Sequence, residues 1–182
     1  MFEPELICPY TGLRSFTEEE SLYFKGRDVD IDQATEQLQR NKFLMLTGAS
    51  GDGKSSLIYA GIIPNARAGF LKSKFTNWCV ADFRPERSPF ENLCKAIARQ
   101  LDIPSYYTVK SELDHGFSAI ADLYKNSKRF IDTESVAWMN ADDKGKAALK
   151  REAANLLILV DQFEEFFTNP ENYHKGVPSG DS

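Results

Sequence analysis

The stretch Gly48-Ala49-Ser50-Gly51-Asp52-Gly53-Lys54-Ser55 decides the fold expected of this chain. It fills the pattern G-x-x-x-x-G-K-[ST], in which a glycine-rich loop cradles phosphate groups. The preceding run 43–47 (FLMLT) predicts a short buried strand, and the following run 55–60 (SSLIYA) predicts the first turns of a helix. A strand, a glycine loop and a helix in this order are the context in which the pattern forms a phosphate-binding P-loop.

The residue types of the loop suit a phosphate ligand. Its three glycines permit backbone angles that let successive N–H groups point at one anion, and the helix that follows adds the positive end of its dipole. Lys54 is expected to contact the β- and γ-phosphates, Ser55 to bind Mg²⁺, and Ser56 to contact the α-phosphate. The loop therefore predicts binding of a nucleoside triphosphate with Mg²⁺, and it does not by itself predict hydrolysis.

A second run supplies an acid. Residues 156–160 (LLILV) are consecutive apolar residues, which predicts a strand buried on both faces. Asp161 follows at the carboxyl end of that strand, the edge of the sheet where ligands bind in α/β folds. This is the Walker B pattern. Asp161 is expected in the magnesium shell, largely through water, and the alternative is an Asp that caps the next turn.

A nucleotide hydrolase also needs a group that orients the attacking water. Gln162 directly follows the acid, and Glu164 and Glu165 come two and three residues further on. If the strand continues, Gln162 and Glu164 point to the same side. Either could position water, and Glu164 is favoured because a carboxylate can also accept a proton. Glu165 is equally suited to the first turn of a helix.

Size and composition limit the class of protein. The chain has 182 residues, 42% of them hydrophobic, which is enough for one domain or a large part of one. A net charge of −5 without a dense Lys/Arg block argues against a nucleic-acid-binding surface. Neither a signal peptide nor a run of membrane length is present, so a cytoplasmic protein without a membrane anchor is expected. The three widely spaced cysteines predict buried thiols in a reducing compartment, and the histidines predict surface positions: Cys8, Cys79, Cys94, His115 and His174.

Periodicity and capping signals predict the other elements. A capping box at Thr17 starts a short helix, and Gly61 and Pro64 end the helix after the glycine loop, so that 62–74 is a loop or a short helical turn. Further elements are helices over 28–41, from Ser88 to about 101, over about 111–127 and over 146–155, and a strand over 75–83. The expected segments are 1–41, a partial P-loop core over 42–169 with a helical insert at about 105–155, and a disordered tail or linker over 170–182.

With these residues in place, the chain resembles the amino-terminal NTPase domain of the STAND class (signal-transduction ATPases with numerous domains). It is most similar to the bacterial novel STAND NTPases, which are often joined to WD40 or other repeats. The blocks that carry the resemblance lie in family order at 8–16 (CPYTGLRSF), 23–28 (YFKGRD), 43–56, 78–85 and 156–167. The first and last of these blocks are much more specific than a P-loop alone.

The resemblance implies an α/β fold, specifically a three-layer α/β/α P-loop NTPase of the ASCE type with a parallel sheet, incomplete at the C-terminus. It implies that Gly26 and Arg27 lie beside the adenine and ribose, the alternative for Arg27 being a salt bridge at a helix start. It also implies that Arg84 faces the phosphates or an adjoining subunit, with a structural role as the alternative. ATP or ADP with Mg²⁺ is implied rather than GTP, and no N-K-x-D motif for guanine is present.

The function implied by the resemblance is that of an ATP-driven switch. Slow hydrolysis through Lys54, Asp161 and either Glu164 or Gln162 would control oligomerisation or an effector, for example in bacterial defence. The implied partners are further copies of the chain and sensor, repeat or effector domains, none of which this sequence contains. The alternative is a non-hydrolysing nucleotide-binding regulatory domain, favoured by Gln162 and by the lack of later strands, and turnover by this chain alone is expected to be weak or absent.

Overall fold

The computed structural model describes residues 12, 14–116 and 118–169. Expectations for Cys8, His174 and the tail 170–182 lie outside the described residues. The chain divides into two compact units, Met1–Ser73 and Lys74–Ser182, and each is considered by itself. The segments expected from the motifs, 1–41, 42–169 and 170–182, remain a prediction.

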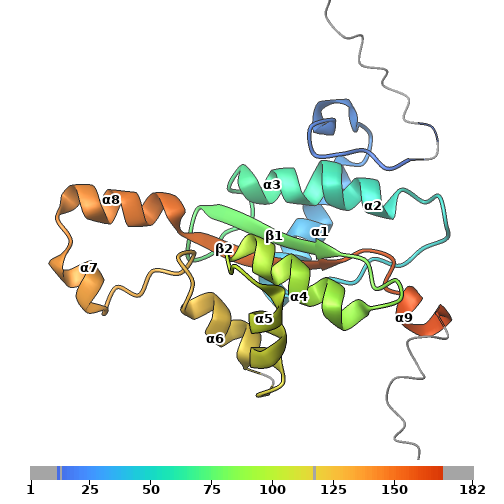
Figure 1. Cartoon of the computed structure of the whole chain (residues 1–182). Coiled ribbons are helices and arrows are strands. Elements are labelled where there is room, and N and C mark those ends of the chain that lie inside the picture. The colour runs from blue at the N-terminus through green and yellow to red at the C-terminus, as the bar shows by residue number, and fades with distance from the viewer. Residues whose placement is uncertain (1–11, 13, 117, 170–182) are drawn as a thin grey trace, which may run out of the picture. The chain divides into compact units, whose positions relative to one another are not determined.

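The first unit is helical in its described part. Its elements are the short 3₁₀ helix η1 (Ser21–Tyr23), α1 (Asp28–Asn41), α2 (Lys54–Ser56), the π-helical η2 (Leu57–Ile62) and α3 (Ile63–Arg67) (Figure 1). The helix predicted over 28–41 is confirmed as α1. Its buried face contains Ile31, Ala34 and Leu38 at helical spacing, as expected.

The helix after the glycine loop is longer than expected. The elements α2, η2 and α3 follow one another without a break to Arg67, so the prediction that Gly61 and Pro64 end the helix is wrong, and the short helical turn given as one alternative for 62–74 is present as α3. The π turn explains why Pro64 does not end the helix. The Ile63 N–H bonds to Ile58 O, five residues back, and the widened turn accommodates a proline, which has no N–H to donate. Gly61 packs against α1, because a Cβ there would lie 2.7 Å from Ile31 Cγ1.

The strand predicted over 43–47 is also wrong. The structure gives this run no regular secondary structure, and Phe43 and Met45 are exposed by 71% and 59%. A strand forms only when its backbone groups pair with a neighbour. In the described part of the first unit no strand is available to pair with it.

The second unit contains a parallel two-stranded sheet. Strand β1 (Asn77–Phe83) pairs with β2 (Ala154–Val160) in a register that sets Asn77 opposite Ala154 and Phe83 opposite Val160. Strands and helices together give a mixed α/β chain, as predicted. The helices of this unit are α4 (Pro89–Gln100), α5 (Tyr106–Leu113), α6 (Ala119–Lys125), α7 (Val136–Asn140), α8 (Asp143–Glu152) and α9 (Glu165–Thr168).

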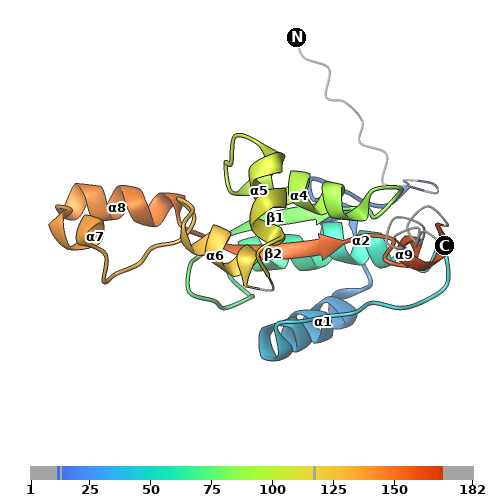
Figure 2. The same ribbon diagram turned by 60° about the horizontal axis from the view of Figure 1, so that its bottom comes forward.

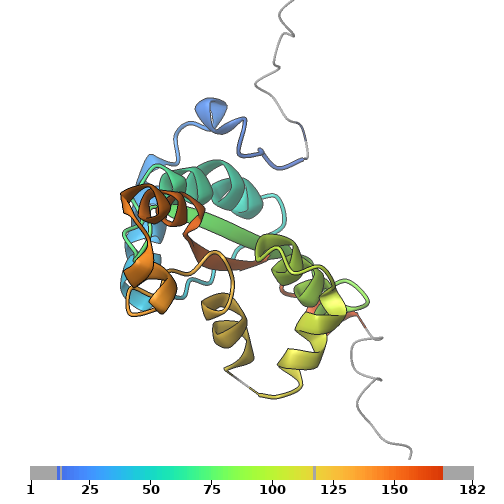
Figure 3. The same ribbon diagram turned by 60° about the vertical axis from the view of Figure 1, so that its left-hand side comes forward.

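The core of the second unit lies between β1 and α4. Helix α4 packs on β1 and on α5, and α5 packs on α6 (Figure 3). The most enclosed side chains of this core include Ile97, Cys94 and Val109, each with no exposed surface. Cys79 is buried in the same cluster, and burial raises the pKa of the Cys79 and Cys94 thiols. Both thiols are therefore buried and free, as expected.

The helix predicted over 111–127 is wrong. Its residues belong to two helices, α5 and α6, which are separated at Gly116. The φ of Gly116 is +137°, a value that interrupts a right-handed helix and that glycine adopts easily. The apolar residues of this run do have helical spacing, but those before and after Gly116 belong to separate helices. His115, beside the break, is exposed as predicted.

Strand β2 lies between two helices in the sequence and is only partly buried. Figures 1 and 2 show α8 leading into the start of β2 and α9 beyond its end. The burial of β2 on both faces, predicted from 156–160, is wrong, because Ile158 is 37% exposed and its neighbours are only partly buried.

In the described part of the chain, no helix is both long enough and apolar enough to cross a membrane.

Candidate functional site

The glycine loop of the first unit has the conformation that its sequence predicts. Gly51 and Gly53 adopt φ angles of +91° and +75°, in the left-handed region that favours glycine. Gly53 is the N-cap of α2, so the helix begins at Lys54, as expected. Ser55 lies in the first turn of this helix, and Ser50 is exposed at the tip of the loop. The loop therefore presents backbone amides and a helix start at one place.

Two side chains of the loop bond to its own backbone. The Lys54 ammonium group donates to Gly48 O at 2.9 Å and to Ala49 O at 2.8 Å. The Asp52 carboxylate accepts a hydrogen bond from Ala49 N–H at 2.6 Å. A Cβ on Gly48 would lie 2.6 Å from that same carboxylate oxygen, which gives a physical reason for glycine at this position.

Arg27 lies beside the glycine loop. Its Nη1 donates to Asp52 O at 3.2 Å, and its Nε pairs with Asp30. Arg27 is also the N-cap of α1, and Gly26 before it adopts a φ of +81°. The structure thus brings Arg27 to the loop and also gives it the salt bridge at a helix start that was the alternative.

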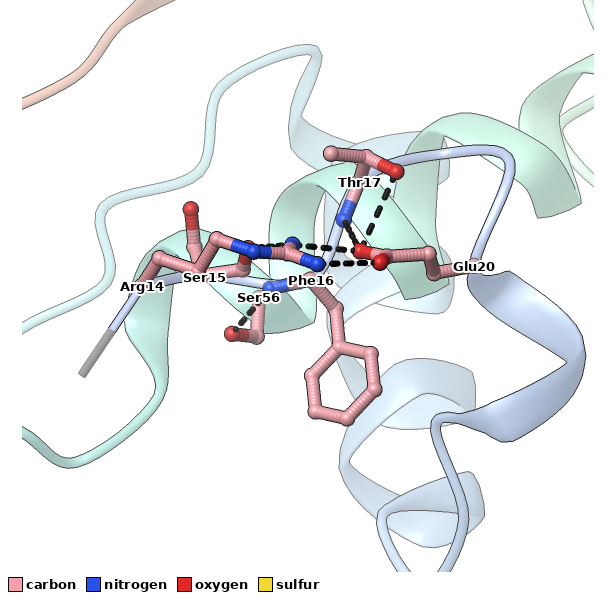
Figure 4. A network of polar contacts seen from close by, with 6 residues as sticks. All are labelled: Arg14, Ser15, Phe16, Thr17, Glu20 and Ser56. Carbon is pink, nitrogen blue, oxygen red and sulfur yellow. Dashed lines mark hydrogen bonds and ion pairs between the residues drawn. The ribbon is translucent and has the colours of Figure 1, made fainter. Parts of the chain in front are cut away.

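A polar network holds the segment before η1 against the loop helix (Figure 4). The Phe16 N–H donates to Ser56 Oγ at 3.1 Å, and Ser56 is buried. Arg14 donates to both carboxylate oxygens of Glu20, at 2.7 and 2.5 Å, and Thr17 N–H donates to one of them at 2.9 Å. The bonds from Arg14 first, and then that from Thr17, lower the pKa of Glu20 to about 2. The half of the capping box in which Glu20 accepts a hydrogen bond from Thr17 N–H is therefore formed. Only the single 3₁₀ turn of η1 follows it.

Asp161 of the second unit is a buried acid at the end of β2. Its exposed fraction is 5%, and its N–H donates to Phe83 O at 3.0 Å, which extends the ladder beyond the last strand pair. Arg84 follows β1, and its Nε and Nη2 donate to Asp161 Oδ2 at 3.0 and 2.8 Å. Parallel pairing thus places the residues after both strands side by side.

The side chains after Asp161 do not alternate as a strand would place them. Strand β2 ends at Val160, residues 161–164 form a turn, and Gln162 adopts a φ of +57°. The expectation that Gln162 and Glu164 share one side of a continuing strand is therefore wrong. Both side chains are exposed. Glu165 begins α9, the alternative given for it.

The candidate metal ligands are few, as they are for a Mg²⁺ ion that is bound mainly by phosphate oxygens and water. The described residues contain no group of three or more His, Cys, Asp or Glu side chains that would hold a metal ion by themselves. Mg²⁺ in nucleotide sites keeps several waters and binds through one or two protein oxygens and the phosphates. Each unit, taken by itself, offers one oxygen donor of the kind that such a metal takes: the Ser55 hydroxyl in the first turn of α2, and the buried carboxylate of Asp161.

The comparison with known families decides the class. The sequence profile of the family described as Novel STAND NTPase 1 matches residues 9–176, which is most of the chain. This chain belongs to the Novel STAND NTPase 1 family. Neither the search of curated proteins nor that of solved structures gave a match. Membership supports the resemblance drawn from the sequence and identifies the chain as a nucleotide-binding P-loop NTPase domain.

Three contacts of this STAND NTPase domain were not predicted from the sequence. The bond between Asp52 and Ala49, the bond between Phe16 and Ser56, and the pairing of Arg84 with Asp161 all depend on how the chain folds back. For the last of these contacts the sequence offers one hint, because Arg84 directly follows a segment that is predicted to be a strand. Neighbouring parallel strands end at the same edge of a sheet, which places Arg84 near Asp161.

Proposed function

We propose that this domain binds ATP with Mg²⁺ and serves as the switch module of a STAND-type signalling protein. In this proposal slow hydrolysis in the longer protein controls oligomerisation or effector output, for example in bacterial defence. The proposed architecture is the three-layer α/β/α P-loop fold of the ASCE type with a parallel sheet. Family membership supports the nucleotide and the fold, and the remaining steps are our inference.

The observation that carries the proposal is the conformation of the glycine loop. Gly51 and Gly53 hold positive φ angles, and a helix starts at Lys54 directly after them. This arrangement gathers N–H donors and a positive dipole end, which together favour a multiply charged anion. Because the chain belongs to a family of NTPases, we take this anion to be the β- and γ-phosphates of a nucleotide.

The proposed roles follow from chemistry and position. Lys54 would exchange its two carbonyl acceptors for phosphate oxygens, and Ser55 and Asp161 would hold Mg²⁺, Ser55 through its hydroxyl oxygen and Asp161 largely through water. Arg27 and Gly26 lie on the base side of the nucleotide. Bound Mg²⁺ would neutralise phosphate charge, and the protein residues position the triphosphate.

A thermal-shift titration with Mg-ATP, Mg-ADP and Mg-GTP, beside Lys54→Ala, tests the proposal. Ligand at about 100 times Kd stabilises the folded state by about 2.7 kcal/mol. For a chain of this length that corresponds to a rise in Tm of roughly 5–10 °C. Mg-ATP and Mg-ADP should produce this shift, Mg-GTP should produce less, and Lys54→Ala should abolish it.

Lys72→Ala is the matched control, because Lys72 is an exposed lysine of the same unit outside the loop. It should keep the full nucleotide shift. A shift that is equal in the wild-type chain and in Lys54→Ala, or no shift with any nucleotide, would contradict nucleotide binding by this loop.

A non-hydrolysing regulatory domain is the second candidate, and one observation favours it. Gln162 and Glu164, the residues proposed to position water, are exposed in a turn. Phosphate release by the longer protein, measured for wild type, Glu164→Gln and Gln162→Ala, separates the two functions. Loss of turnover in either variant supports hydrolysis by that residue. Nucleotide binding without phosphate release in the wild type supports the regulatory domain.

A further inference from the structure

The carboxylate of Asp161 is already paired with a cation of its own chain. Two nitrogens of the Arg84 guanidinium bond to one and the same oxygen, Oδ2, at 2.8 and 3.0 Å. Only 6% of the Asp161 side chain is exposed. A carboxylate so far from water is costly unless a positive charge and hydrogen-bond donors compensate it. Arg84 supplies both.

A divalent cation and a guanidinium compete for the oxygen atoms of one carboxylate. Mg²⁺ is a hard cation that is bound by carboxylate oxygens directly or through its waters. Arginine binds carboxylates by donating N–H groups to those oxygens. An Asp161 Oδ2 that accepts two N–H donors from Arg84 must therefore give up at least one of them when a metal or a metal-bound water takes that position.

Arg84 combines a fixed backbone with a side chain that can leave. Its carbonyl accepts a hydrogen bond from Asn92 Nδ2 at 3.0 Å, and the Glu86 N–H two residues later donates to Glu165 at 2.8 Å. The next residue, Pro85, is fully buried. The Arg84 side chain itself is 49% exposed, in contrast to its partner.

Arg84 also borders an open hollow. The hollow has a volume of about 340 Å³ in the second unit, and its charged lining contains the acids Asp82 and Glu86 and the cations Lys95 and Arg99. Because Arg99 already pairs with Asp82, the hollow offers the Arg84 side chain room to move and not a second counter-charge.

We propose that Arg84 is the counter-ion of Asp161 in the metal-free protein and that a divalent cation must displace it. The inference rests on the proposed function, in which Asp161 serves a metal. Arg84 then sets how much Mg²⁺ the domain needs, because metal binding includes the breaking of an ion pair. The pair also keeps the buried acid compensated while no metal is bound.

The first test compares Arg84→Gln with Arg99→Gln. Arg99 makes a matched control: it pairs with Asp82 at the same 2.8 Å in the same unit, but that carboxylate is 40% exposed. Tm is measured at fixed ATP while MgCl₂ is varied. Arg84→Gln should lower the half-saturating Mg²⁺ concentration by roughly fivefold, the size expected of one partly exposed ion pair, and Arg99→Gln should leave it unchanged.

The same variants without nucleotide give a second readout. Arg84→Gln should melt at a lower temperature than wild type, since it takes the guanidinium charge away from the buried carboxylate, and MgCl₂ or MnCl₂ alone should restore part of the loss. An unchanged Mg²⁺ requirement in Arg84→Gln overturns the inference. So does an increased requirement, which would place Arg84 on the phosphates.

A measurement on the wild-type chain covers the case in which Arg84→Gln fails to fold. The Nε–H signal of Arg84 in a ¹⁵N NMR spectrum, identified by its loss in Arg84→Lys, should shift or broaden as Mg²⁺ and ATP are added. A signal that stays unchanged while ATP binds contradicts displacement. If ATP gives no Lys54-dependent Tm shift at all, the proposed function fails instead, so the two failures are distinguishable.

Discussion

The glycine loop and the acidic motif are held in place in different ways. In the first unit, the glycine loop keeps its shape through positive φ angles and through bonds that Lys54 and Asp52 make to the loop itself. In the second unit, the acid is positioned by a paired strand, and a side chain from the neighbouring strand end compensates it. One motif is shaped by local sequence, and the other depends on residues far away in the chain.

This difference shows which motifs form without a sheet. The loop is present although the run before it, 43–47, forms no strand. The acid has no comparable independence, because both the pairing of β2 with β1 and the bond from Arg84 are long-range contacts. The glycine-loop motif therefore predicts its local structure more directly from the sequence than the acidic motif does, because the position of Asp161 depends on the pairing of β2 with β1.

The largest expected effect is the loss of unfolding free energy when one buried isoleucine in the core of each unit is replaced by alanine. Ile97 has no exposed surface in the second unit, and Ile31 is 9% exposed in the first. Ile97→Ala should reduce the free energy of unfolding by about 3–5 kcal/mol and Ile31→Ala by about 2 kcal/mol, because the more enclosed site leaves the larger cavity. Denaturant unfolding measures both.

The position of the tryptophans lets this experiment separate the units. Trp78 and Trp138 both belong to the second unit, and they are the chain's two tryptophans. Tryptophan fluorescence should therefore register Ile97→Ala strongly and Ile31→Ala weakly, while circular dichroism registers both. Equal shifts of the fluorescence midpoint in the two variants would show that the units unfold as one.

An intermediate effect is expected where the loop helix meets α1. A Cβ at Gly61 would lie 2.7 and 2.9 Å from Cγ1 and Cδ1 of Ile31, so Gly61→Ala should cost about 1–3 kcal/mol of unfolding free energy. The double variant with Ile31→Ala should cost less than the sum of the two single variants, because the alanine makes room for the added methyl group. Strict additivity, measured by circular dichroism, would contradict this packing.

The smallest effect concerns the segment before η1. The hydrogen bonds of Arg14 and Thr17 depress the pKa of Glu20 in the folded chain to about 2, from an ordinary 4.5. A depressed carboxyl pKa stabilises the folded state above the ordinary value, and that contribution disappears as the pH falls through the folded-state pKa. Glu20→Gln should therefore lower Tm at neutral pH, and the difference from wild type should vanish between about pH 4.5 and 2.

Glu19→Gln is the control for this pH dependence, because Glu19 is the exposed neighbour of Glu20. Its Tm should follow the wild-type curve throughout. A Tm difference for Glu20→Gln that stays constant from pH 7 to pH 2 would mean that the carboxylate's charge contributes nothing.

Sequence alone predicted what depends on local chemistry. The loop, the helix start at Lys54, α1 with its buried face, and the acid at the end of β2 all follow from residue types at fixed spacing. The failures come from one strand partner missing among the described residues and from two local backbone angles. The run 43–47 looked like a buried strand but has no described partner. Gly116 divided a helical pattern, and the turn with Gln162 at positive φ ended the alternation after Asp161.

The register of the sheet also affects the order in which the chain can assemble during synthesis. Asn77 pairs with Ala154, and each later pair keeps the same long separation. Long-range parallel pairing forms slowly, since the intervening chain must first be brought together. At ribosomal rates of about 5–20 residues per second, β1 waits roughly 4–15 s for its partner to be made. We expect the helices between them to form during that interval and the sheet to close last.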